Sequence, residues 1–173
     1  PAKASATREA KEQRDGKPQA SEPAPRTSLR VVIDSEPYHL NPILDPDLWG
    51  YRIAHDLLCE PLLRRRQGTS ESGAGAYEGA LAESFSITSS GEEITIALRR
   101  GARFHDGKPV TAYDVRATLE RLGAAGRAAP RTQALVADLL RVEVLSAERL
   151  RLVWRRGGAR ALAALAQIDI LAE

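Results

Sequence analysis

The sequence predicts a mixed α/β (α+β) fold with two β-hairpins and short helices, preceded by an unstructured tail. Residues 84–98 and 142–154 each alternate polar and apolar side chains around a short polar turn, which is typical of a β-hairpin. Residues 111–123 instead place apolar side chains at helical spacing. A chain of 173 residues, 43% hydrophobic and 28% charged, has enough apolar residues for one folded domain.

The first 28 residues are rich in Ala, Pro, Ser, Lys, Arg and Glu and contain no large apolar residue. Such a segment buries too little surface to offset its ordering entropy, so we expect a disordered tail or linker over 1–28 and the folded part over 29–173. A tether to a membrane anchor would have this composition, and so would any unstructured tail. The chain begins at Pro1 with no leader pattern, which indicates a removed signal peptide or a fragment.

The folded part is expected to start with a strand. Leu29–Ile33 is short, β-branched and mostly apolar, which predicts a strand buried on both faces. The segment 34–42 contains two prolines and several turn-forming residues, so we predict a loop there.

A short helix and a second strand should follow this loop. Asp47 can cap a helix that runs to about Cys59, with Ile53 and Leu57 on one face. Residues 62–65 follow a proline and predict a strand.

The middle of the chain predicts a loop and then the two hairpins. Residues 68–79 are rich in Gly, Ser and Ala and predict a flexible loop. The first hairpin pairs 84–88 with 93–98, and the second pairs 142–145 with 150–154. We expect two separate hairpins, because no repeat of fixed period links them.

Two further helices are expected. Thr111 is a good N-cap, Asp114 favours the helix N-terminus three residues later, and Gly123 should end this helix. An Ala-rich stretch over 158–167 predicts the last helix. The residues expected to face the core are Val115, Leu119 and Leu122 in the first helix and Leu162 and Leu165 in the second.

The charge pattern argues against nucleic-acid binding. The formal net charge of +2 is small, and the basic residues are spread along the chain. We interpret the densest run, 64–66, as a solvated strand end rather than a phosphate contact. No apolar run approaches the roughly 20 residues that span a bilayer, and the single Cys59 can form no internal disulfide.

We predict that the protein is not an enzyme and binds no cofactor. The sequence lacks the G-x-S-x-G and H-E-x-x-H motifs and a phosphate-cradling glycine loop. His55 and Cys59 lie four residues apart on a predicted helix and could present two ligands to one metal, but no further close pair follows. Because a buried cysteine is commonly a small apolar filler, we predict no metal site.

The segment Leu98–Val115 reads LRRGARFHDGKPVTAYDV. It resembles the L-R-x-G-V-x-F-H-D-G-x-P-x-T-A-x-D-V pattern of the bacterial solute-binding proteins of ABC importers that include oligopeptide-, dipeptide- and nickel-binding members. Ala102 replaces the usual Val. The stretches 40–42, 60–63 and 79–85 resemble three upstream blocks of the same family, in the same order.

The resemblance implies a partial first lobe of a two-lobed periplasmic-binding-protein fold. It further implies a periplasmic or extracytoplasmic protein that binds peptides or similar small solutes and delivers them to an ABC permease in the inner membrane. Whether a lipid anchors its N-terminus, as in a lipoprotein, stays open. The missing second lobe or a partner chain would complete the enclosure of the solute.

Most of the segment Leu98–Val115, which we call the signature, forms a strand–turn–helix corner rather than a ligand-binding site. Gly107 permits a backbone angle that other residues resist, Pro109 fixes the approach to the helix, and Asp106 can accept backbone hydrogen bonds. We therefore expect His105 to be packed or hydrogen-bonded. The binding chemistry should lie elsewhere.

The candidate ligand-binding residues lie in the loop after the first predicted strand. Ligands of α/β folds tend to bind beyond the carboxyl ends of strands, so we select Glu36, Tyr38 and His39. The alternative is that these residues only shape the turn.

Two other functions stay open, because family members are much longer than this chain. The chain could serve as an interaction or assembly subunit, in which case an exposed apolar patch or a partner chain should mark the place of the missing strands. It could also be the ligand-sensing domain of a regulator, although no helix-turn-helix pattern appears.

Overall fold

The computed structural model describes residues 30–173, so the predicted tail lies outside the described residues. The chain divides into two units, Pro1–Val32 and Ile33–Glu173. Of the first unit only residues 30–32 are described, and they form no regular secondary structure. All helices and strands of the described part lie in the second unit. None of these helices is long and apolar enough to cross a membrane.

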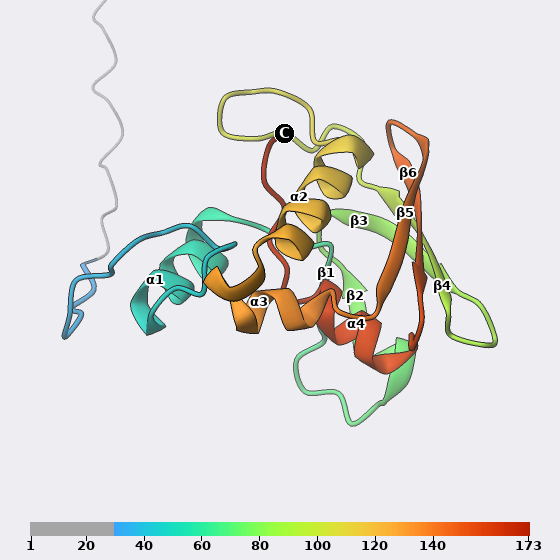
Figure 1. The fold of residues 1–173 in the computed structure, drawn as a ribbon, viewed down its shortest axis with the longest axis horizontal. Helices are drawn as coiled ribbons and strands as arrows, with labels where there is room; N and C mark the ends of the chain where they lie inside the picture. The colour runs from blue at the N-terminus through green and yellow to red at the C-terminus, as the bar shows by residue number, and fades with distance from the viewer. Residues whose placement is uncertain (1–29) are drawn as a thin grey trace, which may run out of the picture. The chain divides into compact units, whose positions relative to one another are not determined.

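A four-stranded antiparallel sheet forms one side of the second unit, with helices against its inner face (Figure 1). Its strand order is β3 (Ala82–Ile87), β4 (Glu93–Leu98), β6 (Arg149–Trp154) and β5 (Leu139–Ser146). The structure confirms both predicted hairpins. They are not separate, however, because β4 pairs with β6 and makes one sheet of them. An isolated two-stranded hairpin is marginal in water, and this pairing gives both hairpins a shared apolar face.

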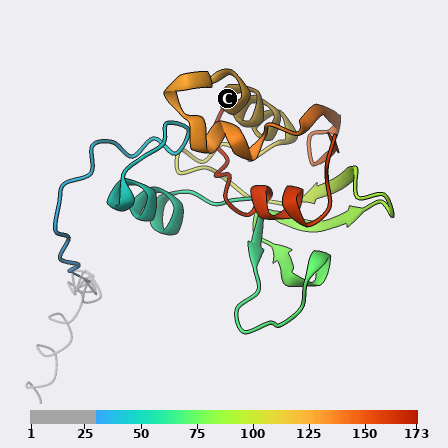
Figure 2. The same ribbon diagram turned by 60° about the horizontal axis from the view of Figure 1, so that its bottom comes forward.

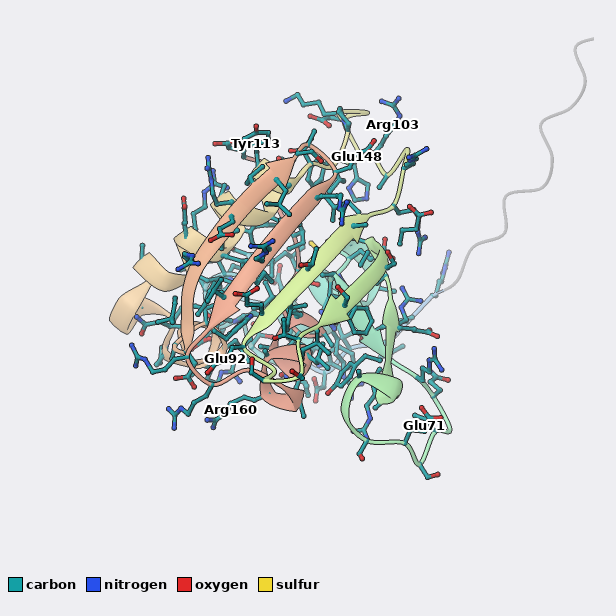
Figure 3. The ribbon with its side chains drawn as sticks, turned by 90° about the vertical axis from the view of Figure 1, so that its right-hand side faces the viewer. Glu71, Glu92, Arg103, Tyr113, Glu148 and Arg160 are labelled. Carbon is teal, nitrogen blue, oxygen red and sulfur yellow. The ribbon has the colours of Figure 1, made fainter. Side chains whose placement is uncertain are left out.

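The two faces of this sheet differ in polarity. The inner face carries Ile94, Ile96 and Leu98 of β4 and Leu150, Leu152 and Trp154 of β6, all at most 2% exposed. They share one core cluster with residues of α2 (Ala112–Ala124) and α4 (Ala159–Leu165). Figure 3 views the sheet from its outer face, with Glu92 and Glu148 at its two ends. On this face Arg151 forms ion pairs with Glu143 at 3.4 Å and Glu93 at 3.9 Å.

The helix α2 begins as the sequence predicts. The Thr111 side chain accepts the amide N–H of Asp114, and the Asp114 carboxylate accepts the Thr111 N–H at 2.8 Å, which together form a capping box. We expected this helix to end at Gly123, but it continues to Ala124, and the chain turns at Gly126 with φ +55°. In α4, Leu162 and Leu165 are buried as expected.

The first helical segment consists of α1 (Leu48–Ile53) followed directly by the wider π-helical turn η1 (Ala54–Leu58). Asp47 caps it as predicted and accepts the amide N–H groups of Trp49 and Gly50, both at 3.0 Å. The expected common face of Ile53 and Leu57 is wrong, since Leu57 is 74% exposed. A π-helical turn holds more residues than an α-helical one, so Leu57 rotates away from the face of Ile53.

A second, two-stranded sheet pairs β1 (Leu63–Arg65) with β2 (Tyr77–Gly79), and Figure 2 shows it below α4. The predicted strand over 62–65 is confirmed. The expected flexible loop over 68–79 is wrong at its end, where the 3₁₀ turn η2 (Gly73–Ala76) precedes β2. A Gly- and Ala-rich composition carries no strand signal, and pairing with β1 decides the structure here.

Three more segments depart from expectation. Residues 30–33 form no strand, and Val31 and Val32 are 65% and 92% exposed. A strand needs a partner for its backbone groups, and none of the strands in the described part pairs with this segment. The sequence also did not predict η3 (Gly126–Ala128) and α3 (Pro130–Leu135), which are too short to show a helical period.

The last residues form an extended segment beside α2, residues 168–173, held mainly through main-chain groups. The Thr118 hydroxyl accepts the N–H of Leu171 at 3.1 Å and donates to its carbonyl at 3.2 Å. Asp114 accepts the N–H of Glu173 at 2.9 Å, and Asp169 pairs with Pro61 in an isolated β-bridge. This segment therefore ties α2 to the start of the small sheet.

Candidate functional site

A hollow of about 540 Å³ opens at the loop in which the sequence placed the ligand-binding residues. We call it the Tyr38 hollow. It is lined by Tyr38, Asp45, Pro46, Asp47, Leu48, Tyr51 and Arg131.

The cap of α1 also positions one wall of this hollow. Asp47 Oδ2 accepts the amide N–H of Tyr38 at 2.8 Å, while Oδ1 accepts the two amides at the helix start. The hydrogen bonds from the amides of Gly50 and Tyr38 lower the pKa of Asp47, because they stabilise its charged form. One carboxylate thus caps the helix and holds the loop against it.

The opposite wall comes from α3, far along the chain. The Asp45 carboxylate accepts the amide N–H groups of Arg131 and Thr132, both at 2.9 Å. The Arg131 guanidinium donates to the carbonyl of Pro46 at 2.9 Å. Burial raises the pKa of Asp45, but the hydrogen bonds from Arg131 and Thr132 outweigh it and the pKa is lowered. Arg131 is therefore fixed at the rim of the hollow.

The lining combines aromatic rings with charges of both signs. Tyr38 is 92% exposed and Tyr51 38% exposed, so both rings are available to a ligand. Asp45 and Asp47 supply two carboxylates, and Arg131 supplies one guanidinium. This chemistry suits a small solute that has both apolar and charged parts.

The three predicted residues occupy different places. Tyr38 lines the hollow, whereas Glu36 is exposed and lies outside the lining. His39 is half-buried, and its carbonyl oxygen lies 2.5 Å from where a Cβ at Gly50 would stand. The glycine thus permits the close approach of the loop to α1. The ring atom Nδ1 of His39 is buried without a hydrogen-bond partner in the described structure.

Sequence reasoning missed Tyr51 and Arg131 as lining residues. Tyr51 lies one helical turn after Leu48, so its position beside the loop follows once Asp47 is accepted as the cap. No local signal points to Arg131, because its place depends on the contact between Asp45 and α3.

A second hollow of about 490 Å³ lies beyond the other end of the same helix. We call it the His55 hollow. It is lined by residues 55–61 with Arg64, Leu81, residues 103–105, Val110 and residues 170–172. His55 Nδ1 lies 2.8 Å from Oδ1 of Asp169, whose side chain is 1% exposed. The hydrogen bond with Asp169 raises the pKa of His55 against the opposing effect of burial.

Cys59 lines the same hollow as His55. Burial raises the pKa of its thiol, which disfavours the thiolate that a metal would bind. Residues 30–173 contain no group of three or more His, Cys, Asp or Glu side chains arranged to hold a metal ion.

The signature corner has the predicted backbone geometry. Gly107 has φ +86°, and Asp106 Oδ1 accepts the N–H of Lys108 at 3.0 Å. The expected packing of His105 is wrong, because its side chain is exposed on the outside of the turn and lines the His55 hollow. Arg103 instead closes the turn with a 2.6 Å hydrogen bond to the Gly107 carbonyl.

Residues 76–172 match the family model described as bacterial extracellular solute-binding proteins, family 5 Middle. This match covers more than half of the chain. No curated protein matches the chain.

Several solved structures share the fold. The PBP AgaA from A. tumefaciens R10, in complex with agropinic acid, is 26% identical with a TM-score of 0.66, over 79% of this chain and 26% of that one. A dipeptide-binding protein from Pseudoalteromonas sp. SM9913, in complex with Met-Leu, is 21% identical with a TM-score of 0.68, over 80% and 30%. NikZ from Campylobacter jejuni, in complex with Ni(L-His), is 22% identical with a TM-score of 0.61, over 80% and 26%.

The described architecture is thus a partial lobe of the periplasmic-binding-protein fold, with mixed α/β structure, two antiparallel sheets and short helices. The chain spans only about 26–30% of the length of the solved proteins it resembles.

Proposed function

Because the chain belongs to the bacterial extracellular solute-binding proteins of family 5, we propose that it acts in solute uptake by an ABC importer. In this proposal it binds peptides or similar small solutes in the periplasm or another extracytoplasmic space. It then delivers them to a permease in the inner membrane, without catalysing a reaction. Attachment through a lipid remains part of the same proposal.

The Tyr38 hollow is the observation that carries this proposal. It places two accessible aromatic rings beside two carboxylates and one guanidinium, which suits a peptide with a free amino end, a free carboxyl end and an apolar side chain. Glu36, Tyr38 and His39 remain the proposed contacts, and Tyr38 is the one that lines the hollow. Tyr51 and Arg131 join them.

Recognition would need few sequence-specific contacts. An extended peptide can bind through its main chain and termini, which leaves its side chains free to vary. A second lobe closing over the hollow would bury the solute and present the loaded form to the permease. A single partial lobe should bind weakly, since part of the enclosing surface is absent.

Calorimetry with a mixed pool of tri- to pentapeptides tests the proposal. We expect binding heat with the unchanged chain and its loss in Tyr38→Ala. Tyr113→Ala is the matched control, because Tyr113 is 45% exposed on α2 and lies outside the lining of the hollow. The absence of heat from a chain shown to be folded by circular dichroism would contradict peptide binding by this lobe.

A second function, as an interaction or assembly subunit, also has an observation in its favour. Large apolar side chains are exposed between residues 38 and 58. They are Tyr38, Leu40, Leu44, Leu48, Tyr51, Leu57 and Leu58. An exposed apolar patch of this kind commonly marks a protein–protein contact.

A further inference from the structure

Two aromatic side chains connect the Tyr38 hollow with the His55 hollow. Tyr51 lines the first hollow and His55 lines the second. Their rings stack with centroids 4.9 Å apart and an angle of 17° between the ring planes. A change in how the His55 ring is held therefore reaches one wall of the hollow proposed for the solute.

The second contact of the His55 ring is with Asp169. Nδ1 of His55 lies 2.8 Å from Oδ1 of Asp169, and the two side chains are 17% and 1% exposed. Among the described residues, His55 is the only side chain hydrogen-bonded to this carboxylate. Asp169, His55 and Tyr51 thus form a row that begins in the segment 168–173 and ends at the Tyr38 hollow.

The charges around the His55 ring favour its protonated form. Besides Asp169, the titratable and charged side chains that line the hollow around this ring are Asp56, Cys59, Glu60, Arg64, Arg103 and His105. Arg64 is paired with Glu60 at 3.2 Å, and Arg103 donates to a main-chain carbonyl of the signature turn. The hydrogen bond with Asp169 raises the pKa of His55, burial opposes this effect, and the charge of Asp56 adds to it.

Tyr51 keeps its proton throughout the range in which a histidine titrates. Burial raises the pKa of Tyr51, and the charges of Asp169 and Asp56 raise it further. Of the two stacked rings, only that of His55 therefore changes its charge near neutral pH.

The proton on His55 strengthens both contacts of its ring. A charged ring donates a charge-assisted hydrogen bond to the Asp169 carboxylate, which is stronger than the bond from a neutral ring. A cation against the face of a tyrosine ring is also attracted by its π electrons. Loss of the proton weakens both attractions and holds Tyr51 less firmly. Because a wall residue that is already fixed loses less freedom when a solute binds, a firmly held Tyr51 gives a higher affinity.

We propose that His55 is a pH-sensitive switch for the Tyr38 hollow, whose protonated ring fixes Tyr51 and strengthens solute binding. The stronger binding is present below the ordinary histidine pKa and is lost as the pH rises through the raised pKa of His55. By reciprocity, a bound solute raises the affinity of His55 for its proton. The inference rests on the proposed solute binding, but the coupling of the two rings is measured without any solute.

NMR relaxation of the Tyr51 ring carbons in the full chain without solute tests this coupling. We expect an ordered ring at about pH 5.5 and a more mobile one at about pH 8.5, with the change centred on the titration of His55 in the same spectra. His55→Gln should leave the ring equally mobile at both pH values. His105→Gln is the matched control and should retain the change, since His105 is exposed on the signature turn. A Tyr51 ring whose order does not follow the titration of His55 would overturn the proposal.

Asp169→Asn tests the other end of the row, and it also serves if His55→Gln fails to fold by circular dichroism. The substitution keeps the size of the side chain and removes the charge that holds the proton on His55. The pKa of His55 should fall, and the change in the order of Tyr51 should move to lower pH with it. A change that stays at its original pH while the pKa of His55 falls would refute the switch.

Calorimetry at the same two pH values tests the effect on binding. For a single tripeptide that gives heat at the lower pH, the dissociation constant should rise about fivefold at the higher pH, beyond the change seen with His55→Gln. The comparison with His55→Gln removes the titration of the amino end of the peptide, which occurs near pH 8. An equally strong pH dependence in His55→Gln would belong to another group, such as His39, and would overturn the proposal.

The two measurements separate a failure of the switch from a failure of solute binding. If the Tyr51 ring follows His55 but no peptide gives heat at either pH, peptide binding is contradicted and with it the regulatory role of His55. If peptides bind with the same pH dependence in the unchanged chain and in His55→Gln, solute binding stands and the switch alone is refuted.

Discussion

The sheet core and the loop-and-helix region over 38–58 use their apolar residues in opposite ways. In β4 and β6 every second side chain is apolar and turns toward α2 and α4, and the polar side chains face outward. In α1–η1 the fully buried residues are the small Gly50 and Ala54, whereas Leu48, Leu57 and Leu58 are exposed. The core therefore supplies most of the stability of the fold. The outward side chains of 38–58 contribute little to it and remain available for recognition.

The largest expected effect is a difference in how much an apolar substitution in each region lowers the free energy of unfolding. Leu152 is fully buried in β6, so Leu152→Ala should lower the free energy of unfolding by about 2–5 kcal/mol. Leu48→Ala removes the same atoms from an exposed position and should change it by about 0.5 kcal/mol or less. Urea unfolding of both variants at a concentration where the chain is monomeric measures the difference. Similar losses would show that 38–58 is part of the core.

The two helix caps should give a smaller and more selective difference. Thr111→Ala should lower the free energy of unfolding by about 1 kcal/mol, and Asp47→Ala should lower it as well, because each removes a side chain that accepts helix-start amides. Only Asp47→Ala also releases the amide of Tyr38, so it alone should weaken peptide binding. Urea unfolding and calorimetry on both variants separate the two effects. Loss of binding in both would mean that the hollow depends on general stability.

The pair His55–Asp169 should make stability depend on pH. The hydrogen bond with Asp169 raises the pKa of His55, so the charged ring stabilises the folded state. This contribution is complete below the ordinary histidine pKa of about 6.5 and is lost as the pH rises through the raised value. Besides Asp169, Asp56 also raises this pKa, while burial lowers it.

His55→Gln should remove this part of the pH dependence in unfolding experiments between about pH 5 and pH 9. His105→Gln is the control, because His105 is exposed on the signature turn. If the pH dependence of stability is unchanged in His55→Gln, Asp169 does not stabilise the protonated His55 ring.

The smallest expected effect lies on the outer face of the sheet. Arg151 is 40% exposed, and its ion pairs with Glu143 and Glu93 are screened by solvent. Arg151→Gln should therefore change the free energy of unfolding by about 1 kcal/mol or less. The change should shrink further in high salt. Urea unfolding at two salt concentrations measures it, and a large, salt-independent loss would show that this face is packed.

Elements whose interactions are local could be predicted from the residues. The hairpins follow from alternation around a polar turn, and the starts of α1 and α2 follow from Asp47 and Thr111, whose side chains bond amides two or three residues away. The signature corner is local in the same sense, since Gly107 and Asp106 act within one turn.

Elements that depend on distant partners could not be predicted. Leu29–Ile33 has the composition of a strand, but the described part of it has no pairing partner, and Val32 is exposed. The strand β2 has no strand composition, but it pairs with β1. Cross-strand pairing gives more stability than intrinsic strand preference, so the partner decides in both cases.

The residues of the candidate site also differ in whether their place depends on local or on distant contacts. Tyr38 was selected because it follows the predicted strand over 29–33, but residues 30–33 form no strand, and its place in the lining depends instead on its hydrogen bond to Asp47. Arg131 could not be predicted from the sequence, since it reaches the hollow through the contacts of Asp45 with α3, more than 80 residues away. Similarly, His55 was expected on a helix, but its partner Asp169 lies 114 residues further along the chain.

The sequence by itself determined the family, the two hairpins, the helix caps and the glycine-dependent corner, because each of these depends on residues close together in the chain. Only the tertiary structure decided the joining of both hairpins into one sheet, the lining of the two hollows and the outward turn of Leu48, Tyr51 and Leu58. These features depend on which surfaces meet after the chain has folded. That outcome is set by the packing of distant segments and leaves no local pattern in the residues.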